Sequence, residues 1–120
     1  MFKCTCINIE VGSYDNQTFV HSPAHMPKEN GYCLDRCIAE EVMILWQLGI
    51  TTTGCCCGHG KLPAFIGVEF QDINVMKSFG YNVHHNSLRP EDEDSFTPMG
   101  KDFAMSVLLN KININKDETI

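Results

Sequence analysis

The sequence predicts a small α+β domain in which two helices pack on one face of a mixed or antiparallel sheet. Segments whose apolar residues alternate, as in strands, are interspersed with two segments whose apolar residues recur every three or four positions, as in helices. The length of 120 residues suits one ordinary domain, and no linker or internal repeat divides it. We therefore expect a single α+β domain over residues 1–120, in the order β-β-α-loop-β-α-β-β.

Two strands are predicted before the first helix. Residues 3–11 alternate, with apolar or β-branched side chains on one face and Cys4 and Cys6 on the other. A turn over residues 12–16, with glycine, aspartate and asparagine, leads to a second strand over 18–21. Because Cys4 and Cys6 share a strand face, both thiols can point toward one site.

The first helix is predicted over residues 36–48. Asp35 is placed to cap its first amides, and Gly49 is placed to end it. One apolar stripe, which includes Trp46, should pack into the core, whereas Glu41 should face water.

The middle of the chain carries the least usual segment, residues 51–61. Three threonines lead into a glycine-flanked cysteine triplet, and periodicity assigns this segment to no element. A strand over 64–70 follows, then a second helix that Asp72 should cap and Gly80 should end. Residues 81–85 are predicted to form another short strand.

The C-terminal third is predicted to hold a long loop and one strand. Residues 89–100 form a polar, acidic loop with two prolines, and the Glu91–Asp94 run within it should be solvated. The spacing of this run does not fit a calcium-binding EF-hand loop. A last strand is predicted over 103–109, and the end of the chain, rich in asparagine and lysine, should fray.

The acidic composition of the chain disfavours some classes of binding partner. Fifteen acidic against nine basic residues give a formal net charge of −6, so nucleic acid is an improbable partner and an anionic membrane surface is disfavoured. Residues 1–6 lack the apolar segment of a signal peptide, and the longest strongly apolar stretch, residues 42–46, is too short to span a bilayer. We expect a cytoplasmic protein with reduced thiols that binds a protein, a small molecule or a metal.

Seven cysteines in a reducing compartment indicate a metal site. A disulfide framework fits poorly, because the count is odd and the thiols of the consecutive residues 55–57 cannot easily bridge one another. Unmetallated buried or reactive thiols are the alternative. Zinc takes about four ligands in a tetrahedron, often as pairs close in sequence, and the chain offers three such groups. The predicted zinc ligands are Cys4, Cys6, Cys33, Cys37, Cys55, Cys57 and His59.

Within the loop group, Cys55 and Cys57 are favoured over Cys56, because the side chains of adjacent residues diverge. Glycines between and around the ligands permit the backbone to fold around an ion. Cys37 is predicted to lie in the first turn of the first helix, where the helix dipole favours a thiolate.

These features favour a zinc-stabilised binding or regulatory module over an enzyme, because the sequence offers no poised acid/base pair. One alternative is a small zinc- or cysteine-dependent hydrolase, which would need an open coordination position for water. Another is a binder of a small anionic ligand, held by backbone amides of the glycine-rich loop over 54–61.

The sequence over residues 52–60, Thr-Thr-Gly-Cys-Cys-Cys-Gly-His-Gly, resembles the signature of a family of small proteins from phages and Firmicutes. The resemblance also takes in residues 12–17 and the Cys33/Cys37 pair, so it covers most of residues 1–85. It implies an origin in a mobile element. Small phage proteins of this size often block a host enzyme or defence system, so the resemblance implies a host protein as the partner.

Four residues of the same segment, Thr52, Thr53, Cys56 and Gly58, are also similar to the Thr-Thr-x-x-Cys-x-Gly turn of the tRNA wybutosine-synthesis methyltransferase family. That turn is followed by a strand and a helix, as predicted here. His59 stands where that family has arginine, and this chain lacks the basic surface that RNA binding needs.

Overall fold

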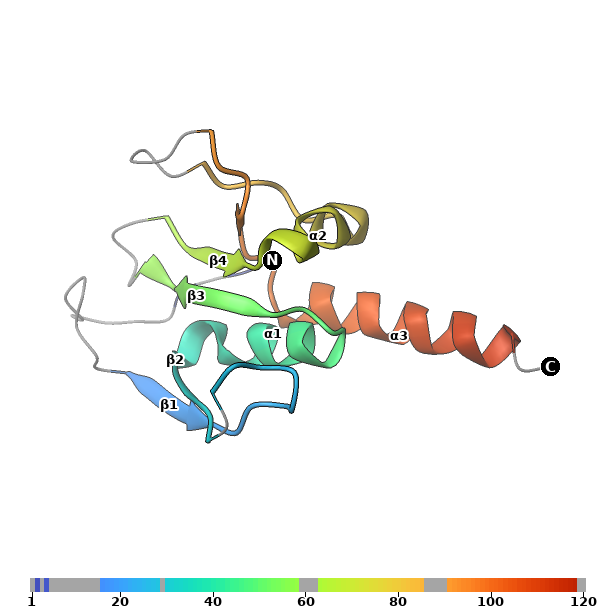
Figure 1. The fold of residues 1–120 in the computed structure, drawn as a ribbon, viewed down its shortest axis with the longest axis horizontal. Helices are drawn as coiled ribbons and strands as arrows, with labels where there is room; N and C mark the ends of the chain where they lie inside the picture. Colours follow the sequence, from blue (N-terminus) through green and yellow to red (C-terminus); the bar gives the residue numbers. More distant parts are fainter. Residues whose placement is uncertain are drawn as a thin grey trace.

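The architecture is that of the predicted α+β class. A computed structural model of the chain describes Phe2, Cys4 and residues 16–28, 30–58, 63–85 and 91–118. Over these residues the chain forms three α-helices and two antiparallel sheets, one of two strands and one of three (Figure 1). The predicted strand over 3–11 and its turn lie outside the described residues, apart from Cys4.

The first sheet pairs β1 (Gln17–Val20) with β2 (Tyr32–Asp35). β1 confirms the strand predicted over 18–21, whereas β2 was not predicted. Four residues are too few for a clear alternation, and β2 depends on its pairing with β1. The pairing sets Phe19 opposite Cys33, and both residues are exposed.

Helix α1 (Arg36–Gln47) follows β2 directly and confirms the first predicted helix. It ends at Gly49 as expected: the φ angle of this glycine is +89°, and its N–H donates to the Trp46 carbonyl over 3.0 Å. The face that includes Ile38 and Leu45 is fully buried in the core.

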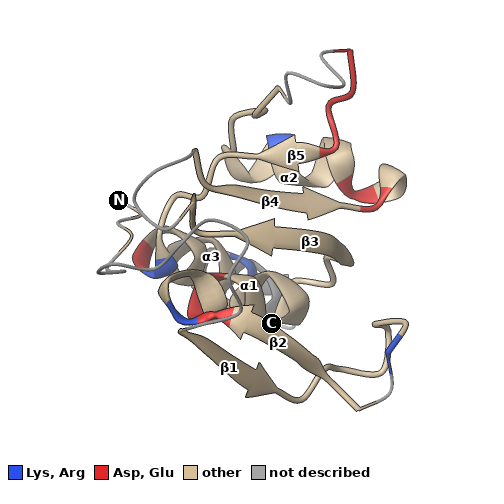
Figure 2. Cartoon of the chain, turned by 90° about the vertical axis from the view of Figure 1, so that its left-hand side faces the viewer, with Lys and Arg blue, Asp and Glu red and all other residues tan. Residues whose placement is uncertain are grey.

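The second sheet has the strand order β3-β4-β5, with β3 (Thr52–Cys56), β4 (Phe65–Val68) and β5 (Ser95–Phe96). These three strands lie side by side in Figure 2, and β3 also contacts β2 of the first sheet. The cysteine triplet, which periodicity assigned to no element, therefore begins within a strand, where Cys55 pairs with Ile66. β5 lies inside the segment predicted to be a loop.

A 3₁₀ turn (Phe70–Asp72) leads into helix α2 (Ile73–Phe79). The prediction that Gly80 ends this helix is confirmed by its left-handed φ of +102°. The short strand predicted over 81–85 is reduced to one isolated bridge, between Val83 and Phe96.

The strand predicted over 103–109 is wrong, because these residues belong to helix α3 (Lys101–Glu118). Phe103 and Val107, like Ala104 and Leu108, are four residues apart, and packing against α1 buries this face wholly or in part. Figure 1 shows the rest of α3 running out from the body of the molecule. Within the described part of the chain, no helix combines the length and the apolar character needed to cross a membrane.

Asp35 and Asp72 both occupy N-cap positions, as predicted, but neither side chain caps its helix. Each carboxylate is buried and accepts an N–H from a remote part of the backbone instead. Asp35 Oδ2 accepts from Cys57 over 3.1 Å, and Asp72 Oδ2 accepts from Thr51 over 2.8 Å. The two carboxylates therefore tie the starts of α1 and α2 to the two ends of β3.

Glu41 was expected to face water, but it is only 2% exposed. Its carboxylate accepts three hydrogen bonds: from the N–H groups of Met99 and Gly100, over 2.8 and 2.9 Å, and from the Tyr81 hydroxyl, over 2.7 Å. Burial of a carboxylate is tolerated when its oxygens are satisfied in this way. Glu41 thereby holds the entry to α3 against α1.

Glu41→Ala should lower the free energy of unfolding by about 3 kcal/mol, because it leaves three hydrogen-bond donors in the core without an acceptor. Urea denaturation followed by circular dichroism measures the change. Glu40→Ala is the matched control, since Glu40 is exposed and forms only a surface ion pair with Lys101, and it should cost less than about 0.5 kcal/mol. Equal losses in the two variants would contradict the role given to Glu41.

Stability should also fall in alkali through Tyr81. Burial, and then the adjacent Glu41 carboxylate, raise the pKa of Tyr81 above its ordinary value of 10.0. Above pH 10.0 the unfolded chain therefore loses the phenol proton while the folded chain retains it, which favours unfolding. Denaturation from pH 8 to 11 should show a steeper fall in the wild type than in Tyr81→Phe. Parallel curves for the two proteins would count against this coupling.

Candidate metal centre

Three thiols from distant parts of the sequence converge at one end of the sheet region. Cys4 Sγ lies 3.9 Å from Cys37 Sγ and 3.7 Å from Cys57 Sγ, and the three sulfur atoms all lie within 4.8 Å of one another. Cys4 belongs to the N-terminal segment, Cys37 to the first turn of α1, and Cys57 directly follows β3.

Two of the sulfur separations are compatible with a shared metal ion. A Zn–S bond of about 2.3 Å and a tetrahedral angle separate two ligand sulfurs by roughly 3.8 Å. A disulfide would require about 2.05 Å. The Cys4–Cys37 and Cys4–Cys57 separations of 3.9 and 3.7 Å match the first value. The three cysteines could therefore hold a metal ion.

Local structure at Asn16 and the start of α1 positions Cys37. Asn16 adopts a φ of +61°, in the left-handed region that asparagine tolerates better than most residues. Its carbonyl accepts the Arg36 N–H over 2.9 Å, and its side-chain amide donates to Cys37 Sγ over 3.9 Å. Cys37 lies in the first turn of α1, as predicted.

Cys57 is positioned by the hydrogen bond to Asp35 and by the turn that follows. The side chain of Cys57 is 2% exposed, and its backbone N–H donates to Asp35 Oδ2. The next residue, Gly58, has a φ of +76°, and a Cβ there would lie 3.3 Å from the backbone of residues 63 and 64. This turn therefore requires glycine.

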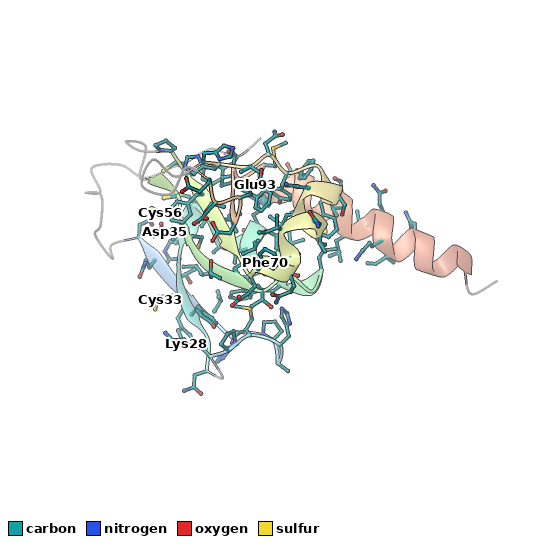
Figure 3. The ribbon with its side chains drawn as sticks, turned by 45° about the horizontal axis from the view of Figure 1, so that its top comes forward. Lys28, Cys33, Asp35, Cys56, Phe70 and Glu93 are labelled. Atoms are coloured by element: carbon teal, nitrogen blue, oxygen red, sulfur yellow. The ribbon has the colours of Figure 1, made fainter. Side chains whose placement is uncertain are left out.

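Cys56 lies beside the cluster without being one of the three. Its sulfur accepts the Gly58 N–H over 3.3 Å, and Figure 3 shows it next to Asp35. Burial raises the pKa of Cys56, the bond from Gly58 opposes this effect, and the charges of Asp35 and Cys4 raise the pKa further.

Cys55 and Cys33 line a different space, a cavity of about 190 Å³ between β2 and β3 that Tyr32 and Trp46 help to close. Burial, and then the charges of Asp35 and Cys56, raise the pKa of Cys55 to about 12. Cys33 is exposed on β2. Neither sulfur lies in the three-thiol cluster.

Of the predicted ligands, the structure therefore brings together Cys4, Cys37 and Cys57. It leaves Cys33 and Cys55 apart, while Cys6 and His59 lie outside the described residues. The roles of these four remain predictions. Sequence analysis missed Asn16 as a residue that positions the cluster, and treated Asp35 only as a helix cap. The position of Asp35 between Cys33 and Cys37 was the available signal for it.

Comparison with known proteins does not assign the chain to a family. No protein-family model matches the chain, and searches of curated proteins and of solved structures find no match either.

Thiol reactivity should follow these environments. Among the six described cysteines, Cys33 is the exposed one and Cys57 the buried one. Cys33 should therefore react first with a disulfide reagent such as dithionitrobenzoate, and Cys57 should react only as the protein unfolds. Mass spectrometry of partly labelled, digested protein identifies the order. Rapid labelling of Cys57 in the folded protein would contradict the geometry, as would faster labelling of any of the other four described cysteines than of Cys33.

Proposed function

We propose that this chain is a small zinc-binding protein that acts as a binding or regulatory module on another protein. The observation that carries the proposal is the convergence of Cys4, Cys37 and Cys57, with sulfur separations suited to one tetrahedral ion. Zinc bound there would fasten the N-terminal segment to the start of α1 and the end of β3.

The sequence supplies two candidates for the fourth ligand. Cys6 lies two residues after Cys4, and His59 lies two residues after Cys57. Either would complete a tetrahedron of the Cys₄ or Cys₃His kind, which is typical of structural zinc sites. Such sites contribute directly to folding, on the order of 10 kcal/mol in small zinc domains. A closed site of this kind supports a structural role for the metal.

The surroundings of the cluster support the same role. The Asp35 carboxylate accepts the Cys57 N–H and so helps to hold Cys57 in place beside the other two thiols. A hydrolase would instead need a water on the metal and a base within reach of it.

A protein is the proposed partner. The net charge of −6 opposes binding to nucleic acid. The resemblance of residues 52–60 to small proteins of phages and Firmicutes supports a host protein that the module inhibits. We place the protein in the cytoplasm, where thiols stay reduced and available to zinc.

Protein purified under reducing conditions, without added metal, should contain about one zinc per chain by elemental analysis. Chelation should release the metal, raise the number of reactive thiols and lower the midpoint of thermal unfolding, because the site contributes to folding. Cys37→Ser and Cys57→Ser should each lower the zinc affinity by at least about 100-fold, whereas Cys33→Ser should retain full zinc content.

Replacing zinc with cobalt distinguishes a closed, structural metal site from the open site of a hydrolase. A closed site should give the intense visible absorption of tetrahedral thiolate-bound cobalt, and added anions such as azide should leave it unchanged. A spectrum that shifts with azide would indicate an open position and favour the hydrolase. Metal-free, folded protein would contradict the zinc proposal altogether.

A further inference from the structure

A second feature of the molecule uses none of the metal-site residues. A groove of about 520 Å³ runs between the segment Phe70–Phe79, which holds the 3₁₀ turn and α2, and the acidic run Glu91–Asp94. This volume falls within the range of about 300–1,000 Å³ usual for ligand pockets. Phe70 and Glu93, on its two sides, are labelled in Figure 3.

Both sides of the groove are anchored to the body of the protein. The Asp94 carbonyl accepts the Val68 N–H over 2.8 Å, which fixes the acidic run to β4. Across the groove, Lys77 Nζ lies 3.0 Å from Glu93 Oε1. The groove is therefore present before any ligand arrives, so binding need not order it.

The exposed side chain of Phe70 indicates that the groove is a binding surface. Its side chain is 86% exposed, more than any other large apolar side chain of the described residues. Aromatic residues, phenylalanine among them, are enriched at protein interfaces. Ile73, half-buried on the same side, extends this apolar surface into the groove.

The charges around Phe70 define the chemistry of the partner. Four carboxylates, those of the run Glu91–Asp94, line the groove, and the ammonium group of Lys77 is the single positive charge among its lining residues. Figure 2 shows this run as a continuous acidic stretch ahead of β5. The face of an aromatic ring and a carboxylate both attract cations, so the two sides of the groove favour the same ligand.

We propose that this groove binds an arginine-containing segment of a partner protein. The planar guanidinium group would stack on Phe70 while it donates hydrogen bonds to the carboxylates opposite, and an apolar neighbour would contact Ile73. Arginine suits both surfaces because it stacks and pairs at once, whereas lysine acts as a point charge. The inference rests on the proposed role as a binding module, but it does not depend on the metal.

The test is a titration of ¹⁵N-labelled protein of known zinc content with the acetylated, amidated peptide Arg-Leu-Arg-Leu-Arg. Amide shifts should change over residues 70–77 and 91–94, and affinity should fall as salt is raised. The same peptide with citrulline in place of arginine has the same shape without the charge, and it should not bind.

Two pairs of variants make the test specific. Phe70→Ala should weaken binding by about fivefold. The control, Phe19→Ala, removes another exposed phenylalanine, on β1, and should have no effect. Glu93→Gln should weaken binding by about threefold. Glu40→Gln, its control, also removes the acidic partner of a surface lysine but lies outside the groove.

Several results would overturn the inference. They are the absence of shifts at the groove, equal binding of the citrulline peptide, and unchanged affinity in Phe70→Ala. Calcium binding at 91–94 without peptide binding would make the run a cation site. Self-association lost in Phe70→Ala, without peptide binding, would make the partner a second copy. Folded protein that contains no zinc as purified but binds the peptide would contradict only the metal proposal, and zinc-loaded protein that does not bind the peptide would contradict only the groove proposal.

Discussion

The hydrogen bond from the Cys57 amide to the buried Asp35 carboxylate fixes the end of β3 against the start of α1. Because Cys37 follows Asp35 by two residues, the same bond sets two of the three clustered thiols at a fixed separation. Burying either the carboxylate or the amide without a hydrogen-bond partner costs free energy, so breaking this hydrogen bond would destabilise the fold. The candidate metal centre depends on it.

Buried carboxylates accept hydrogen bonds from backbone amides at two other places in the fold. Asp72 holds the Thr51 amide at the beginning of β3, and Glu41 holds the two amides that precede α3. In the described part of this acidic chain, three carboxylates are thus buried and accept hydrogen bonds from backbone groups that secondary structure leaves unpaired. The acidic residues are therefore not all on the surface. Among the acidic residues outside the core, Glu91, Asp92 and Glu93 are exposed side by side.

The two functional features lie on different elements of one frame. The thiol cluster joins the N-terminal segment, α1 and the end of β3, whereas the groove lies between α2 and the segment that enters β5. β4 pairs with both β3 and β5 and so connects the two regions. In the proposed function, zinc would stabilise one end of this frame and the groove would present a charged, aromatic surface to a partner.

Local sequence was sufficient to predict α1, because helix periodicity is visible in neighbouring residues. It was also sufficient for the glycines that end α1 and α2, which adopt positive φ angles. The abundance of cysteine likewise pointed to thiols as the candidate metal ligands. The strand predicted over 103–109 was wrong because these residues satisfy both the strand and the helix periodicity, and only contact with α1 selects the helix. The roles of Asp35, Glu41 and Asp72 were mispredicted because the amides that donate to them are between 21 and 59 residues away in the sequence. The sequence by itself determined that cysteines dominate the chemistry; only the tertiary structure decided that Cys4, Cys37 and Cys57 meet, because long-range packing sets distances between residues that the chain keeps far apart.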